Sequence, residues 1–150
     1  MSDEERQWNS PPPPYPLAMV VCDNIHRDPG TGKYFLLGCF SVIHAKQFPA
    51  VHPLLALYVS VTNGRGTVPL RVQLVDANEE REPIVVVESD VEFSDPRIVL
   101  DLRFLLGNLT FVEPGEYRFQ LFASNEFLME RRVIVAQVQQ DQVDEEGDDQ

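Results

Sequence analysis

The sequence predicts an all-β domain: an antiparallel β-sandwich that is immunoglobulin-like in the broad sense, with disordered termini. Apolar and polar residues alternate in short runs, which is the period of a strand with one buried face. Glycine, proline and asparagine separate these runs at the spacing of roughly 8–12 residues that is typical of sandwich domains. No segment shows the 3.6-residue period of an amphipathic helix.

The chain of 150 residues suits one domain with two flanking segments. Residues 1–16 end in a run of prolines and predict a disordered Pro-rich leader, either a stiff linker or a docking peptide for an aromatic groove. Residues 17–138 are expected to form the β-sandwich domain. Residues 139–150 hold six acids and no base, which predicts a disordered acidic tail.

Each predicted strand is an apolar or alternating run that lies between two turns rich in glycine, proline or asparagine. The run 34–43 is nearly continuous in apolar residues, which predicts a central strand, and Gly38 within it indicates a bulge or a close approach of the backbone. An irregular link is expected at 44–53, and Gly107–Asn108 is expected to turn the chain. The other predicted strands before the final hairpin are 17–25, 55–61, 70–74, 84–93, 98–104 and 109–112.

A hairpin from residue 113 to residue 135 organises the predicted domain. Tyr117, Phe119 and Leu121 share one face of its first strand. After a turn at 124–126, the matching face of the return strand is expected to carry Phe127, Met129, Val133 and Val135. Tyr117 follows a Pro-Gly corner. It is either an ordinary core tyrosine or a tyrosine corner, whose hydroxyl bonds to backbone a few residues upstream.

The formal net charge of −12 lies mostly at the two ends, and residues 17–138 carry only −4. Phosphates attract clusters of lysine and arginine, and no such cluster is present, so we expect neither nucleic acid nor a membrane surface as a partner. No signal peptide opens the chain and no apolar run reaches the roughly 20 residues of a membrane helix. These observations favour a cytoplasmic protein, with an unidentified protein partner left open.

Cys22 and Cys39 lie in apolar runs and are expected to be buried free thiols. With His26, His44 and His52 they are the candidate metal ligands. Cys22 and His26 would stand about 13 Å apart on one strand, and the chain has no C-x-x-C or H-x-x-x-H pair. We therefore expect no metal, no cofactor and no catalytic residue. His26 and His44 fall at the ends of adjacent strands, where a chance pair near one rim is the remaining alternative.

Other motifs are weaker. Residues 30–33 lack the spacing of a phosphate-binding loop, and no serine lies in G-x-S-x-G. The acidic stripe of Glu88, Asp90 and Glu92 is interpreted as a solvated strand face, because calcium needs six to eight oxygens. The segment 48–55 contains Phe48, Val51 and Leu54, and either seals an edge of the sandwich or offers an apolar patch to a partner.

Four segments carry a family resemblance: Met19–Ile25 with Gly32-Lys-Tyr, Leu37–Ser41, Phe48–Pro53 and Pro114–Phe122. Over roughly residues 17–137 the chain resembles a family of small bacterial proteins known as a domain of unknown function. The resemblance implies a bacterial, sandwich-like domain and brings no activity with it.

We expect a non-enzymatic cytosolic β-sandwich that acts as a binding or scaffold module through its sheet edges or loops. Strand 84–93 has acidic side chains and flanking prolines, which protect an edge. If strand 17–25 lies at the edge of a sheet, it is the better docking site for a partner. The alternative function is a small-ligand-binding protein or a metal-assisted enzyme that uses the rim of His26, His44 and His52.

Overall fold

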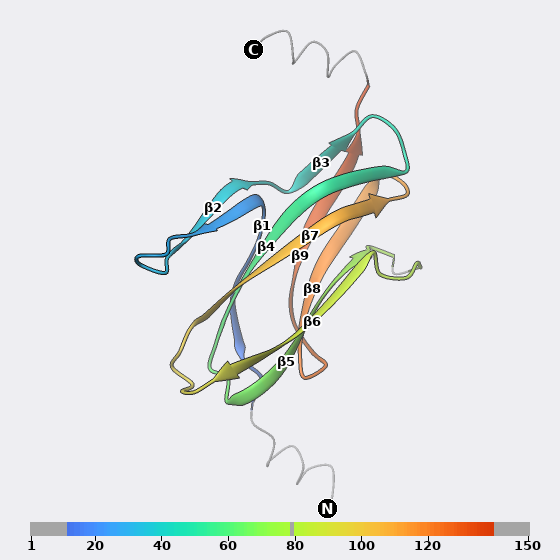
Figure 1. Cartoon of the computed structure of the whole chain (residues 1–150). Coiled ribbons are helices and arrows are strands. Elements are labelled where there is room, and N and C mark those ends of the chain that lie inside the picture. The colour runs from blue at the N-terminus through green and yellow to red at the C-terminus, as the bar shows by residue number, and fades with distance from the viewer. Residues whose placement is uncertain (1–11, 79, 140–150) are drawn as a thin grey trace, which may run out of the picture.

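The computed structural model describes residues 12–78 and 80–139. Within these ranges the chain forms strands and no helix, so no described helix is available to cross a membrane. Figure 1 shows the strands, which are β1 (Tyr15–Arg27), β2 (Tyr34–Cys39), β3 (Val42–Ala45), β4 (Ala50–Thr62), β5 (Gly66–Asp76), β6 (Val85–Phe93), β7 (Leu100–Phe111), β8 (Gly115–Ala123) and β9 (Glu126–Gln137). The all-β prediction is confirmed.

The strands form two sheets. The first sheet has the order β2-β1-β4-β7, and the second has the order β3-β9-β8-β5-β6. Every pairing is antiparallel except that of β3 with β9, which is parallel. The inner faces of both sheets share one hydrophobic cluster, so the sheets pack against each other as two layers (Figure 1).

The core follows the expected alternation. Along β4, four apolar residues at every second position are fully buried, and β5 and β8 supply matching sets from the second sheet. Burial of each such side chain contributes about 1.5–3 kcal/mol to folding. These residues are Leu55, Leu57, Val59 and Val61 from the first sheet and Leu70, Val72, Leu74, Phe119 and Leu121 from the second.

The prediction of one central strand at 34–43 is wrong. The run divides at Phe40 into β2, at the edge of the first sheet, and β3, at the edge of the second. The Ser41 carbonyl accepts a 2.9 Å hydrogen bond from Ile134 N–H, which anchors the crossing. Phe35, Leu37 and Val42 are exposed. The continuous apolar run therefore marks a segment that changes sheets, and not a central strand that is buried on both faces.

The predicted turn at Gly107–Asn108 and the predicted irregular link up to Pro53 are also wrong. β7 runs without interruption from Leu100 to Phe111, and β4 begins at Ala50. The two strands keep one register over their shared length, from Ala50↔Phe111 to Val61↔Leu100. This long ladder outweighs the local turn propensity, and Asn108 stays in the strand with φ of 52°, a value that asparagine tolerates.

Part of the proline leader is ordered, which corrects the expectation that disorder extends to residue 16. Pro14 is buried, and Tyr15 and Pro16 pair with Thr62 and Val61 at the start of β1. Proline tolerates this place because it lies near the end of a strand. Residues 1–11 and 140–150, where the rest of the leader and most of the acidic tail fall, lie outside the described residues.

The predicted β8–β9 hairpin is confirmed. Ser124 and Asn125 form its turn with φ of 49° and 66°. Tyr117 is buried, and its hydroxyl donates a 2.6 Å hydrogen bond to the Glu113 carbonyl. Its ring packs edge-on against Phe111, with 4.9 Å between the centroids. The upstream backbone bond that defines the tyrosine-corner alternative is therefore present.

Phe127 does not share the inner face of β9, contrary to the sequence prediction. The register of β8 with β9 shifts between Leu121 and Phe122, so β9 holds one extra residue at that point. A one-residue shift reverses the direction of the side chains that follow. Phe127 is consequently exposed and meets Phe122 at 5.8 Å between ring centroids, while Met129, Val133 and Val135 keep the predicted side.

Candidate functional site

A hollow lies where the β1–β2 hairpin leaves the first sheet. β1 pairs with β4 only as far as Cys22↔Ala56; beyond it, β1 continues with β2 to Arg27 (Figure 1). β4 extends back to Ala50 beside β7. A cavity of about 320 Å³, here called the hairpin notch, opens at this divergence. Its lining residues are Asp23, Gly38, Cys39, Phe40, Val42, Ile43, His44 and His52.

Gly38 determines the local shape of the hairpin beside the notch. Its φ is 69°, in the region that favours glycine, and an added Cβ would collide with the carboxylate of Asp23. The sequence indicated a bulge or a close approach of the backbone at Gly38, and the close neighbour is instead the Asp23 side chain. Phe40 N–H then donates a 3.1 Å hydrogen bond to the Val21 carbonyl as the chain turns toward the second sheet.

His52 carries the one buried imidazole nitrogen of the notch with an unmet hydrogen bond. Within residues 12–78 and 80–139, Nε2 is buried and has no hydrogen-bond partner. The imidazole ring lies beside Phe40, with 5.9 Å between the ring centroids. A buried polar atom without a partner costs free energy, so Nε2 is a point of unmet hydrogen bonding in a residue that lines the notch.

The structure divides the predicted histidine rim. His44 on β3 and His52 on β4 both line the notch, because the 46–49 link folds back and brings β3 and the start of β4 together. His26 stays on β1, where its ring lies 6.1 Å from that of Phe35. Among the described residues, no three potential metal ligands form a group that could hold an ion.

The two cysteines differ in exposure, which corrects the expectation that both are buried. Cys22 is fully buried, and its Sγ donates a 3.5 Å hydrogen bond to the Ala56 carbonyl. Burial raises the pKa of the Cys22 thiol, with smaller contributions from Cys39 and Asp23. Cys39 is exposed because β2 is an edge strand, and it lines the notch.

The segment 48–55 matches neither of its alternatives completely. Phe48 is partly buried against the core, as a sealing residue would be. Val51 and Leu54 lie on β4 and remain exposed, at 57% and 47%. This segment therefore closes the core at one position and presents apolar side chains at two others.

The acidic stripe of β6 lies on the outer face of the second sheet. Glu88, Asp90 and Glu92 are all exposed, which confirms the interpretation as a solvated face. Glu88 on β6 lies directly opposite Arg71 on β5, so this carboxylate has a cationic neighbour in register. Nothing in this arrangement gathers the oxygens that calcium requires.

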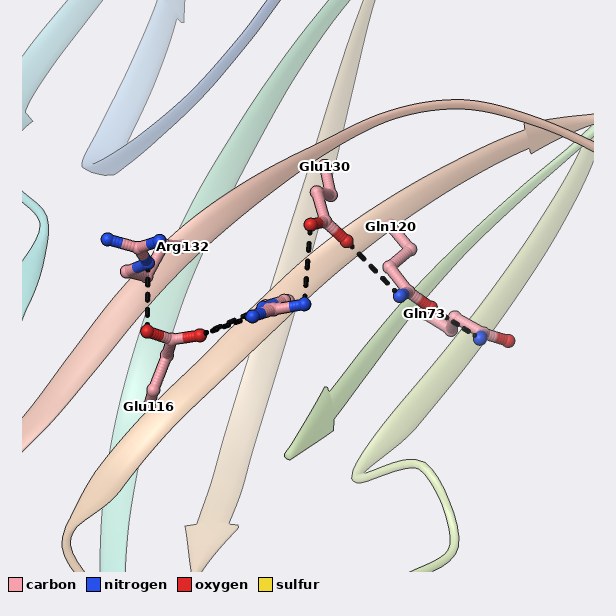
Figure 2. A network of polar contacts seen from close by, with 6 residues as sticks. Gln73, Glu116, Gln120, Glu130 and Arg132 are labelled. Carbon is pink, nitrogen blue, oxygen red and sulfur yellow. Dashed lines mark hydrogen bonds and ion pairs between the residues drawn. The ribbon is translucent and has the colours of Figure 1, made fainter. Parts of the chain in front are cut away.

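A polar network covers the middle of that outer face (Figure 2). Glu116 accepts bonds from Arg118 at 2.7 Å and from Arg132 at 2.9 Å. Glu130 continues the chain of contacts to Arg118 at 3.5 Å and to Gln120 at 3.3 Å, and Gln73 donates to Gln120 at 2.9 Å. Because these charges satisfy one another, the network is a structural feature and the notch is the better candidate site.

Sequence reasoning missed Asp23 and Val42 as members of a site. Asp23 is an ordinary polar residue within a strand pattern, and its place depends on where β1 separates from β4. The available signal was Gly38, since a glycine inside a strand indicates an irregularity. The sequence did not show that the irregularity opens a cavity.

A family model, Family of unknown function (DUF6941), matches residues 17–136. The chain belongs to this family. The resemblance seen in the sequence is thereby confirmed, and the DUF6941 region covers all nine strands except the first two residues of β1 and the last residue of β9. A search of curated proteins finds no match.

Solved structures give partial likenesses to the DUF6941 domain. A β-glucosidase from Erythrobacter marinus is 20% identical with a TM-score of 0.42, over 65% of this chain and 14% of that one. A β-glucosidase from Listeria innocua is 17% identical with a TM-score of 0.43, over 64% and 15%. An alkylpurine DNA glycosylase from Pseudomonas fluorescens is 9% identical with a TM-score of 0.41, over 78% and 30%. The chain spans less than a third of each, and such scores carry no argument about its activity.

Proposed function

We propose that the protein is a non-enzymatic binding module and that the hairpin notch receives an extended peptide segment of a protein partner. The observation that carries this proposal is the divergence of β1 from β4 after the Cys22↔Ala56 pair. Among the described residues, β4 pairs only with β7 from Ala50 to Leu55, so its other edge faces the notch. An exposed strand edge offers backbone hydrogen bonds to an added strand.

The chemistry of the notch supports a peptide with an apolar side chain. Phe40, Val42 and Ile43 provide apolar lining, and His52 provides a nitrogen without a protein partner. The volume of about 320 Å³ is at the lower end of the roughly 300–1,000 Å³ of ligand pockets, which suits a side chain or two. On the β1 side of the divergence, the Ile25 carbonyl already accepts a 3.3 Å hydrogen bond from Arg103 Nη1 and is not open to an added strand. The edge of β4 is therefore the more accessible of the two.

The docking site differs from the one expected at residues 17–25. The first half of β1 does lack a second strand partner among the described residues, but Arg131 Nη1 donates a 3.0 Å bond to the Met19 carbonyl there. Met19 and Val21 are both buried, so a lysine at either position would disrupt the core instead of testing the edge.

Selection from a displayed peptide library, followed by affinity measurement on the selected peptides, tests the proposal. We expect Val42→Arg to weaken binding about tenfold or more, because a charge would enter the apolar lining; tenfold corresponds to about 1.4 kcal/mol. The matched control is Val86→Arg, because Val86 also lies on an edge strand. The exposed fraction is 47% for Val86 and 38% for Val42. Peptides that bind both variants equally, or a library that yields no binder, would reject the notch as a peptide site.

A second candidate is a small-ligand site or a metal-assisted enzyme at the same notch, and the presence of both His44 and His52 in its lining favours it. Zinc titration distinguishes the two candidates. If Zn²⁺ raised the melting temperature of the wild type but not of His52→Ala, the ligand function would take precedence over peptide binding.

We also propose that the two-sheet fold is immunoglobulin-like in the broad sense. The bond from the Tyr117 hydroxyl to the Glu113 carbonyl supports this, since the same corner occurs in immunoglobulin-like sandwiches. A crystal structure whose strand connections could not be superposed on any immunoglobulin-like topology would exclude it.

A further inference from the structure

Cys22 and Cys39 occupy directly opposed positions on β1 and β2. The neighbouring pair, Val21 and Phe40, is joined by the 3.1 Å bond from Phe40 N–H to the Val21 carbonyl. Directly opposed residues of an antiparallel pair have Cα atoms about 4.5–5.5 Å apart. Disulfides accept Cα separations of roughly 4.4–6.8 Å, so the backbone already allows a bridge.

The two thiols are unequal in access. Cys39 is exposed at the notch, whereas Cys22 is fully buried beside Ala56. A dissolved oxidant therefore meets Cys39 first and reaches Cys22 only through its neighbour. Burial also raises the pKa of the Cys22 thiol, so less of it is present as the reactive thiolate.

We propose that Cys22 and Cys39 form a thiol–disulfide exchange site, with Cys39 as the entry thiol, Cys22 as the resolving thiol and a low-molecular-weight disulfide such as glutathione disulfide as the oxidant. The Cys39 thiolate attacks one sulfur of glutathione disulfide and releases one glutathione. The Cys22 thiolate then attacks the Cys39 sulfur and releases the second. The two protein thiols are oxidised to one disulfide, and their protons leave with two reduced glutathiones.

The position of this site beside the notch gives it a consequence for the hairpin. Cys39 lines the cavity and stands next to Gly38, whose backbone fixes the hairpin beside Asp23. A disulfide to Cys22 would draw the Cys39 side chain toward β1. It would also link β2 to β1 covalently at the point where β1 separates from β4. The redox site itself depends only on the cysteine pairing and stands whether or not the notch binds a peptide.

Mass spectrometry of the full chain after exposure to glutathione disulfide tests the inference. The reduced wild type should end with the mass lowered by two hydrogens and no retained glutathione. Cys22→Ala should keep one glutathione, located on Cys39 by peptide mapping, because its resolving thiol is absent. Cys39→Ala should react at least about tenfold more slowly, because the remaining thiol is buried.

A wild type that retains glutathione on Cys39, forms disulfide-linked dimers or does not react would overturn the inference. So would a Cys39→Ala variant that reacts as fast as the wild type. If Cys22→Ala failed to fold, the wild-type masses would still decide the matter, since a transient glutathione adduct followed by an internal disulfide requires both steps. Peptide binding is measured separately under reducing conditions, so failure of the notch as a docking site is distinguishable from failure of the exchange site.

Discussion

The hydroxyl of Tyr117 donates a 2.6 Å hydrogen bond to the backbone carbonyl of Glu113, four residues before it. The bond fixes the entry into β8, the strand at the centre of the second sheet. We expect Tyr117→Phe to lower the free energy of unfolding by about 1 kcal/mol, because only this bond is lost. Tyr117→Ala also removes the ring beside Phe111 and should cost about 3–5 kcal/mol. Urea denaturation of both variants provides the measurement, and a neutral Tyr117→Phe would show that the corner adds no stability.

Gly38 should tolerate alanine poorly. The φ of 69° strains any L-residue, and the new Cβ meets the Asp23 carboxylate, so we expect Gly38→Ala to cost more than 1 kcal/mol. Gly66→Ala is the control, since Gly66 has φ of 65° but no heavy atom within 4 Å of an added Cβ. The excess cost of Gly38→Ala over Gly66→Ala should shrink in an Asp23→Ala background, where only the Cβ of residue 23, at 3.2 Å, remains close. Equal costs in the wild-type background would mean that Asp23 moves aside freely.

Stability should fall at alkaline pH. Burial raises the pKa of Tyr58 above its ordinary value, and the hydrogen bond to Asp101 raises it further. Because the folded pKa is raised, the stabilisation is complete below the unfolded pKa of about 10 and is lost as pH rises toward the folded value. Urea midpoints measured between about pH 8 and pH 11 should decrease less steeply for Tyr58→Phe than for the wild type. Parallel curves for the two proteins would contradict this assignment.

Removal of residues 12–16 should destabilise the domain. Pro14 is buried, and Tyr15 and Pro16 pair with β4, so a fragment of residues 17–150 loses both packing and ladder bonds. Relative to residues 12–150, we expect a loss of about 1–2 kcal/mol, or a fall in melting temperature of several degrees. Calorimetry of the two fragments measures this. Identical melting temperatures would return the domain boundary to residue 17.

Alternation and turn chemistry were enough to predict most strands and the final hairpin, and they left two alternatives open for Tyr117. They are local signals, and β8 and β9 are joined by a short turn, so local information suffices there. The division of residues 34–43 between two sheets was not predictable, because an apolar run looks the same whether a strand is central or changes sheets. Phe127 was misplaced for a related reason: the bulge that reverses its direction depends on pairing with Phe122 and leaves no mark in the sequence.

The hairpin notch was predictable only in part. His44 and His52 were both placed in the candidate histidine rim, and they do line one cavity. His26 was grouped with them from its position at a strand end, but the β1–β2 hairpin carries it beside Phe35. The exposure of Cys39 likewise depends on β2 being an edge strand, which is a property of the sheet order and not of the flanking residues.

The order of strands in the second sheet has a consequence for the protein as it is synthesised. β8 and β9 leave the ribosome after the other described strands, yet they lie inside that sheet and separate β3 from β5 and β6. All four strands of the first sheet are made before them, so its apolar face must wait for residues near 135 before it can be covered. A nascent chain that pauses earlier would therefore expose that face, which is the kind of surface that chaperones bind and that aggregates when unprotected.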